Sequence, residues 1–208
     1  GTMNGKDGKP FKTREGGVMR LEMLMKNINE KMYEKITENH TVDPNEAEKT
    51  AKIVALSAIK YGDLSNQASK DYIFDIDRFT SFEGNTGPYI LYTIVRIKSI
   101  LNRYVEAGGN LEAGEILPAS NGSEKNLMLQ LTGFGATVEN AFEEKAPHKI
   151  CAYIYDLANA FNRFYHETKI LAEEDAGKQK SYIALLKVTK DVLEACIDVL
   201  GFEAPERM

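Results

Sequence analysis

Two tyrosines and an arginine, Tyr89, Tyr92 and Arg96, follow the turn-forming sequence at 83–88 at intervals of three and four residues. In an α-helix this spacing places the three side chains on one face. Aromatic rings stack on unpaired bases and a guanidinium binds phosphate, so such a face suits single-stranded nucleic acid. The same spacing is also typical of tyrosines that simply pack beneath the preceding turn. The residues alone leave both interpretations open.

A second candidate for chemistry is the glycine- and lysine-rich segment GKDGKPFKTREGG at 5–17. Ammonium groups on a loop of this kind can bind nucleotide phosphates, and Lys12 and then Lys9 are the candidates. The segment has no Gly-Lys-Ser/Thr sequence after a strand, so it is not a Walker A loop. As bare sequence it equally fits an ordinary solvated loop.

Cysteine and histidine usage gives no indication of a metal centre. Cys151 and Cys196 each lie within a helical pattern of apolar residues, which predicts buried thiols rather than a disulfide framework or a metal cluster. Such thiols are typical of a reducing cytosol. His40, His148 and His166 are scattered and form no His-x-x-x-His pair. No metal site is therefore expected.

Composition limits the class of protein and of partner. With 43% hydrophobic residues in 208, the chain can bury a core. A net charge of −5 argues against indiscriminate binding of nucleic acid, and DNA is not an expected partner. The charge does not exclude RNA binding, because one helix supplies a local basic stripe of Arg96, Lys98 and Arg103. No apolar run has the length of a bilayer-spanning helix and no signal-peptide pattern opens the chain, so no membrane partner is expected.

The period of the apolar residues is helical from Val18 onward, and no strand is expected. Predicted helices cover about 18–36, 44–61, 75–81, 88–106, 124–132, a segment after Gly135, a long segment from Pro147, and 180–199. Asp43 and Ser123 are predicted N-caps, and Gly62 a helix end. The sequence therefore predicts an all-α fold, a helical bundle with short connections.

Four stretches resemble arginyl-tRNA synthetases. DYIFDIDRFTSFEGNTGPYILYTIVRIKSIL at 71–101 resembles the segment that joins the catalytic domain of that family to its anticodon-binding helices. The other three lie at 5–17, 146–171 and 200–208, in the family's order. The chain thus resembles the C-terminal portion of such an enzyme. The resemblance implies a remnant of the catalytic domain at 1–17, a connecting helical region at 18–83, and an all-α anticodon-binding domain at 84–208.

The resemblance gives the segment at 10–14, PFKTR, the place of the ATP-activating loop of class I synthetases, whose general form is Lys-Met-Ser-Lys-Ser. Lys12 is then the catalytic residue, which binds ATP and stabilises the pyrophosphate leaving group, and Lys9 is a second ATP contact. Nothing in the chain resembles the Rossmann-type domain or its His-Ile-Gly-His-like signature. We therefore expect this chain alone to be inactive and to hold no ATP or Mg²⁺, although the whole enzyme would use both.

The resemblance also implies a set of tRNA-binding residues: Tyr89, Tyr92, Arg96, Tyr165, Lys169 and Met208. Lys169 departs from relatives that carry an aromatic residue at its position, so its role in stacking does not transfer. Without the resemblance, Met208 would be an ordinary chain end. Asn162 and Arg163 either bind base edges and phosphates or form a solvated face.

The expected partners are the tRNA for arginine and, in the full-length enzyme, ATP and L-arginine. The expected state is a cytoplasmic monomer. Two alternatives remain at this stage. One is a free-standing paralogue that binds tRNA without aminoacylating it, and the other is a helical protein-interaction scaffold, which the acidic balance also fits.

Overall fold

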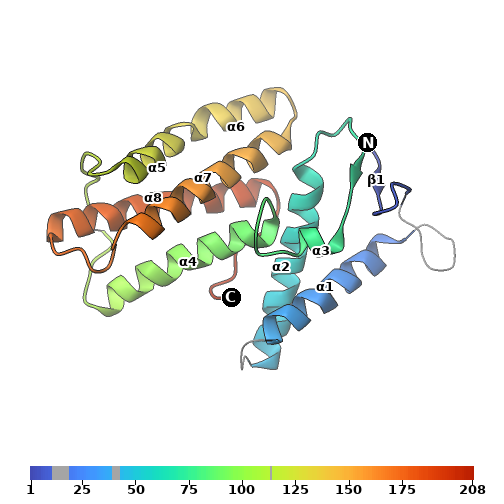
Figure 1. The fold of residues 1–208 in the computed structure, drawn as a ribbon, viewed down its shortest axis with the longest axis horizontal. Coiled ribbons are helices and arrows are strands. Elements are labelled where there is room, and N and C mark those ends of the chain that lie inside the picture. Colours follow the sequence, from blue (N-terminus) through green and yellow to red (C-terminus); the bar gives the residue numbers. More distant parts are fainter. Residues whose placement is uncertain (11–18, 39–42, 113) are drawn as a thin grey trace.

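The described residues, 1–10, 19–38, 43–112 and 114–208 of a computed structural model, form helices joined by loops (Figure 1). The helices are α1 (Leu21–Thr37), α2 (Pro44–Leu64), α3 (Ile76–Phe79), α4 (Gly87–Glu106), α5 (Gly122–Thr132), α6 (Phe134–Glu143), α7 (Pro147–Glu167) and α8 (Ala176–Val199). The predicted all-α class is confirmed.

The long helices form a bundle with an attached helix pair. α4, α7 and α8 pack against one another, and α5 and α6 lie along α7 (Figure 1). At one end of this bundle, α2 crosses α4 and α7, and α1 packs on α2. The groove described below lies at that crossing.

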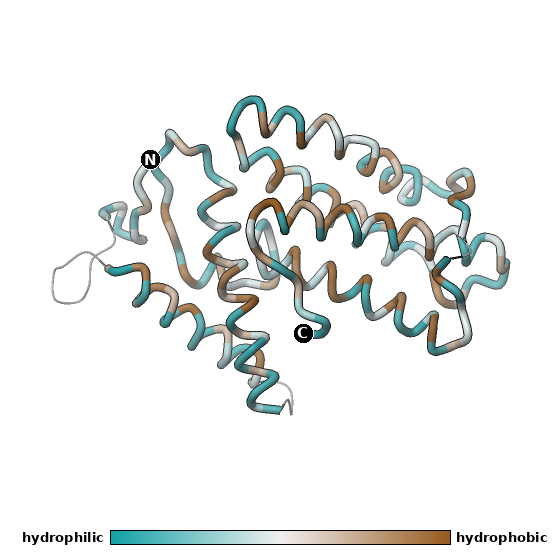
Figure 2. Tube along the Cα trace, turned by 180° about the vertical axis from the view of Figure 1, so that it is seen from behind, coloured by the Kyte–Doolittle hydropathy of each residue, from teal (hydrophilic) through white to brown (hydrophobic). Residues whose placement is uncertain are grey.

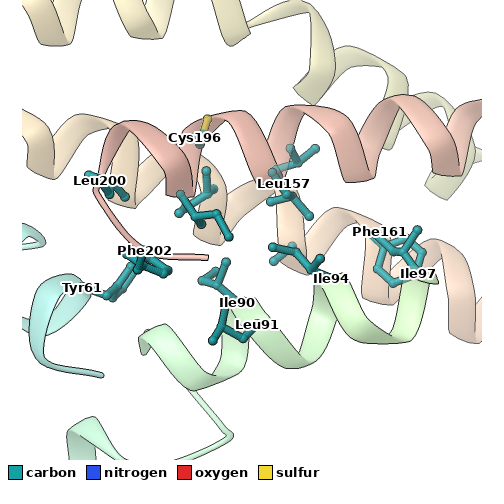
Figure 3. Close-up of a cluster of buried hydrophobic side chains, with 14 of the residues drawn as sticks. Tyr61, Ile90, Leu91, Ile94, Ile97, Leu157, Phe161, Cys196, Leu200 and Phe202 are labelled. Carbon is teal, nitrogen blue, oxygen red and sulfur yellow. The ribbon is translucent and has the colours of Figure 1, made fainter. Parts of the chain in front are cut away.

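One continuous cluster of buried apolar side chains holds these parts together. It includes Ile28 of α1, Tyr61 of α2, Ile94 of α4 and Leu157 of α7. Figure 3 shows Tyr61 beside Phe202 of the C-terminal tail, close to Ile90 and Leu91. Apolar and polar residues recur along each long helix, as the amphipathic pattern requires (Figure 2). The division at residues 83 and 84 stays a prediction, and apolar packing continues across it.

A two-stranded parallel sheet was not expected. β1 (Met3–Asn4) pairs with β2 (Tyr72–Ile73), which brings the N-terminal segment beside the connection between α2 and α3. Strands of two residues are too short to show the alternation by which a strand is recognised in sequence.

The sequence predicted some helix ends correctly and others wrongly. Asp43 caps α2 as predicted, because its carboxylate accepts hydrogen bonds from the backbone amides of Asn45 and Glu46 at 2.9 and 3.3 Å. The predicted cap at Ser123 is wrong: Asn121 caps α5, and Ser123 is buried in its first turn. α8 begins four residues earlier than predicted, at Ala176.

Gly62 does not end its helix, since α2 continues to Leu64. It lies where α2 approaches two stacked rings, Phe74 and Phe79. A Cβ at this position would lie 2.5 Å from Cδ1 of Phe79. The glycine is therefore explained by close packing rather than by helix termination.

Both cysteines are buried, as predicted. Burial raises the pKa of each thiol, Cys151 and Cys196, to about 12. Among the helices that the structure describes, none has the length and apolarity to cross a membrane.

Candidate nucleic-acid interface

The start of α4 is fixed by its capping threonine and by α2. The Thr86 hydroxyl donates to the Ser81 carbonyl at 2.6 Å and accepts from the Tyr89 amide at 3.2 Å. A Cβ on Gly87 would lie 2.3 Å from the Ser57 carbonyl oxygen, so the first turn of α4 lies directly against α2. The backbone from which Tyr89 projects is therefore tightly placed.

A groove of about 890 Å³ lies at the crossing of α1, α2, α4 and α7 with the C-terminal tail. Its lining residues are Lys35, Ile36, Asp43, Glu46, Thr50, Phe82, Glu83, Tyr89, Tyr92, Arg96, Asn162, His166, Arg207 and Met208. The predicted helix face at Tyr89, Tyr92 and Arg96 thus opens onto one groove, and the last residue of the chain lies in it as well.

The Arg96 guanidinium lies between two tyrosine rings. Its Cζ atom is 4.7 Å from the ring centroid of Tyr92 and 5.1 Å from that of Tyr165. The two rings remain 40% and 38% exposed. The Tyr165 ring is backed by the buried ring of Phe161, with centroids 6.1 Å apart and planes 28° apart. Two partly exposed rings and a planar cation therefore form one stacking surface.

Asn162 links the residues of this surface. The Arg96 guanidinium donates to the Asn162 amide oxygen at 2.6 Å. The Asn162 amide nitrogen donates to the Tyr89 hydroxyl at 2.9 Å and to the Thr93 hydroxyl at 3.2 Å. Both amide donors and one of the two acceptor sites of the oxygen are then in use, so Asn162 positions its neighbours. Sequence reasoning left this choice open because it depends on a contact between α4 and α7.

Tyr89 differs from the other two tyrosines. Its hydroxyl donates to Asn159 at 2.7 Å, and its ring meets the edge of Tyr155 at 5.8 Å between centroids. Burial raises the pKa of Tyr89, and the hydrogen bond from Asn162 opposes that shift. Tyr89 is therefore partly buried, whereas Tyr92 presents its ring to solvent.

The predicted basic stripe is wrong at Lys98. Its ammonium group is largely buried and lies 3.3 Å from Glu194 and 2.8 Å from Glu206. It also donates to the Pro205 carbonyl at 3.4 Å. The ammonium of Lys98 lowers the pKa of Glu206. Lys98 therefore anchors the C-terminal tail and is not available to phosphate.

The tail continues from this anchor to the groove. Phe202 is buried, and the chain end lies beside α2 and α4 (Figure 1). Arg207 is paired with Glu46 of α2 at 2.6 Å. Met208 lines the groove and packs against the hydrophobic cluster. Met208 is thus packed at the groove rather than extended into solvent.

The remaining predicted residues lie elsewhere. Lys169 is exposed beyond the end of α7 and does not line the groove. Arg163 is exposed and paired with Glu167 at 2.9 Å, which fits the solvated-face interpretation. Lys9 is exposed in the N-terminal segment, and Lys12 lies outside the described residues. Within the described part of the chain, no group of three or more His, Cys, Asp or Glu side chains is placed to hold a metal ion.

The N-terminal segment is tied to α3 by charge. The Lys6 ammonium lies 3.0 Å from Asp75 and 2.9 Å from Asp77. Lys31 of α1 also pairs with Asp77. Hydrogen bonds from Lys31 and Lys6 lower the pKa of Asp77 to about 2.

Charge alone does not make the groove a phosphate site. Its lysine and arginine side chains, Lys35, Arg96 and Arg207, are balanced by the carboxylates of Asp43, Glu46 and Glu83. Binding of RNA here must therefore depend on stacking and shape more than on bulk charge.

Two family models match the chain. Residues 90–208 match the model of the DALR anticodon binding domain. Residues 1–76 match the model of the catalytic domain of class I (R) tRNA synthetases.

Curated relatives are similar over the whole chain. An arginine–tRNA ligase of Agathobacter rectalis is 69% identical over 100% of this chain, which covers 36% of the relative. One of Alkaliphilus oremlandii is 57% identical over 100% of this chain and 35% of the relative. The chain therefore spans roughly a third of the length of these relatives.

Solved structures show the same fold. The arginyl-tRNA synthetase of Thermus thermophilus aligns with a TM-score of 0.81 at 26% identity, over 100% of this chain and 34% of the other. The arginyl-tRNA synthetase of Plasmodium falciparum aligns with a TM-score of 0.78 at 29% identity, over 91% of this chain and 34% of the other.

Proposed function

Because this chain belongs to the DALR anticodon binding domain family and is similar over its whole length to arginine–tRNA ligases, we propose that it is the tRNA-binding part of such a ligase. In the whole enzyme, ATP activates arginine, and the 2′-hydroxyl of the terminal adenosine of the tRNA accepts it. The helices of this chain bind the anticodon arm. They thereby orient the acceptor end toward a distant catalytic site, which is catalysis by positioning.

The observation that carries this proposal is the stacking surface around Arg96. Tyr92 and Tyr165 present partly exposed rings to its guanidinium, and both Tyr92 and Arg96 line a groove large enough for nucleotides. A stacked base contributes about 1–3 kcal/mol to binding, so two rings can supply most of the affinity for an unpaired loop. Tyr89, on the same face of α4, and Met208, in the C-terminal tail, complete the proposed contact surface.

The N-terminal segment has a separate proposed role. Lys12, with Lys9 second, would contact the phosphates of ATP and stabilise the pyrophosphate leaving group, with Mg²⁺ accompanying the nucleotide. The tether of Lys6 to Asp75 and Asp77 supports a defined position for the start of this segment. The chain alone is expected to give no ATP–pyrophosphate exchange above background. Its two neutral buried thiols fit a reducing compartment, so we propose the cytosol. We also propose a monomeric state.

A binding titration tests the proposed function. The protein is titrated at low salt with the tRNA for arginine and, separately, with a tRNA that carries another anticodon. We expect tighter binding of the arginine tRNA. Equal affinity for both would contradict anticodon reading by this chain, and the absence of binding to either would favour a protein-interaction scaffold.

A further inference from the structure

An ion pair forms part of the groove lining. Nε of Arg207, in the C-terminal tail, lies 2.6 Å from a carboxylate oxygen of Glu46 in the first turn of α2. Both residues line the groove beside Met208. The Arg207 side chain is 82% exposed and that of Glu46 is 38% exposed, so solvent and solutes reach the pair.

Arg207 and Glu46 are each positioned by contacts other than their ion pair. The tail is fixed upstream of Arg207 by buried Phe202 and by Lys98, which binds Glu206 and the Pro205 carbonyl. The start of α2 is capped by Asp43 and does not need the Glu46 carboxylate. The ion pair can therefore open without loss of the surrounding structure.

The other basic side chains of the groove already have neutral partners. Arg96 donates to Asn162, and Lys35 donates to the carbonyl and hydroxyl of Thr80 at 2.8 and 3.3 Å. Of the lysines and arginines that line the groove, Arg207 is the one paired with an acidic residue across it. A guanidinium binds carboxylate and phosphate with the same planar set of donors.

From this arrangement we propose that Glu46 competes with an RNA phosphate for Arg207. This inference rests on the proposed function of the groove as an RNA site. In the free protein the guanidinium binds Glu46. When RNA enters, the guanidinium exchanges that carboxylate for a phosphate. Glu46 thus lowers the affinity for RNA and eases its release.

The test compares Glu46→Gln with Glu48→Gln in a titration with the arginine tRNA at fixed low salt. Both substitutions remove one negative charge from the first two turns of α2. Glu48 does not line the groove and pairs along the helix with Lys52 at 2.7 Å, so it controls for net charge. Since an exposed ion pair contributes little, we expect Glu46→Gln to bind about two- to fivefold more tightly than wild type and Glu48→Gln to bind as wild type does.

Measuring Glu46→Gln in an Arg207→Ala background shows whether the gain in RNA affinity depends on the ion pair. If Glu46 acts through Arg207, the double variant Glu46→Gln/Arg207→Ala binds no more tightly than Arg207→Ala alone. Equal or weaker binding by Glu46→Gln, or a gain that persists without Arg207, would overturn the inference while leaving the RNA site intact. A wild-type protein that binds no RNA would instead contradict the proposed function itself. Thermal unfolding of each variant checks that the fold is unchanged.

Discussion

The Arg96 guanidinium donates a 2.6 Å hydrogen bond to the amide oxygen of Asn162 and so joins α4 to α7 at the rim of the groove. The same amide donates to Tyr89 from its nitrogen. Because Arg96 lies over two tyrosine rings, one neutral side chain fixes the positions of most of the stacking surface.

Asn162→Ala should therefore weaken binding of the arginine tRNA although Asn162 itself contacts no base. The variant loses a hydrogen bond that holds Arg96, and the guanidinium then samples other positions. With a net value of about 0.5–1.5 kcal/mol for such a bond, we expect a loss of roughly two- to tenfold in affinity. A filter-binding or anisotropy titration measures it.

Asn102→Ala is the matched control, because Asn102 is exposed on α4 and does not line the groove. Wild-type affinity in Asn162→Ala, or an equal loss in Asn102→Ala, would show that the hydrogen bond has no role in RNA binding.

Arg96→Lys keeps the positive charge and removes the planar guanidinium. Lysine cannot lie flat between two rings or retain the forked donor geometry. We expect an affinity loss of about two- to tenfold, the size of a partly exposed cation–π contact. The salt dependence should change little, since the charge remains.

Arg103→Lys, at an exposed position of α4, controls for the exchange of residue type. If both lysine variants bind as wild type does, Arg96 acts as a point charge and not as part of a stacking surface.

Gly62→Ala should destabilise the fold even though alanine favours helices. The added Cβ would meet Cδ1 of Phe79 at 2.5 Å and Cε2 of Phe74 at 3.3 Å. Overpacking of this kind costs about 1–3 kcal/mol in the free energy of unfolding, which exceeds the helix-propensity gain of roughly 1 kcal/mol.

Gly135→Ala is the paired comparison, because a Cβ there meets no atom within 4 Å. It should leave stability unchanged or raise it by up to about 1 kcal/mol. Urea unfolding of both variants measures the difference. A Gly62→Ala protein as stable as wild type would mean that the two phenylalanine rings move aside without lowering the free energy of unfolding.

The pH dependence of the N-terminal tether follows from Asp77. Its pKa is lowered from 3.8 to about 2 by hydrogen bonds from Lys31 and Lys6. A lowered carboxyl pKa stabilises the folded state above the unfolded value, and that contribution is lost as the pH falls toward 2. The tether should persist at pH 5. Its stabilising contribution should decline as the pH falls below 3.8, and the folded protein should protonate Asp77 only near pH 2.

An NMR titration of the Asp77 carboxyl carbon checks this prediction. In Lys31→Met the midpoint should move upward toward the ordinary value. A midpoint near 3.8 in the wild-type protein would contradict the ion pairs at α3.

Residues close together in the sequence correctly predicted several helix starts. The proline starts of α4 and α7 and the Asp43 cap are encoded within a few residues, and the structure has them. Gly62 was misjudged because the reason for a glycine there is a pair of rings from another segment. β1 and β2 are two residues long and gain their pairing only when distant segments meet.

The groove likewise combines features set within one helix with features set by packing between distant segments. Residue spacing predicted that Tyr89, Tyr92 and Arg96 share a face, since that depends on one helix. The approach of Tyr165, the link through Asn162 and the burial of Lys98 all depend on how α4 packs against α7, α8 and the tail. No pattern within one helix carries that information.

The most direct test of RNA binding at the stacking surface is the affinity of Tyr165→Ala for the anticodon stem-loop of the arginine tRNA. Tyr165→Phe keeps the ring. Tyr33→Ala removes a ring that is similarly exposed, at 37%, but is not one of the two rings over which the Arg96 guanidinium lies. We expect Tyr165→Ala to bind about five- to a hundredfold more weakly and both controls to bind as wild type does. Wild-type affinity in Tyr165→Ala, or an equal loss in Tyr33→Ala, would contradict RNA binding at this surface.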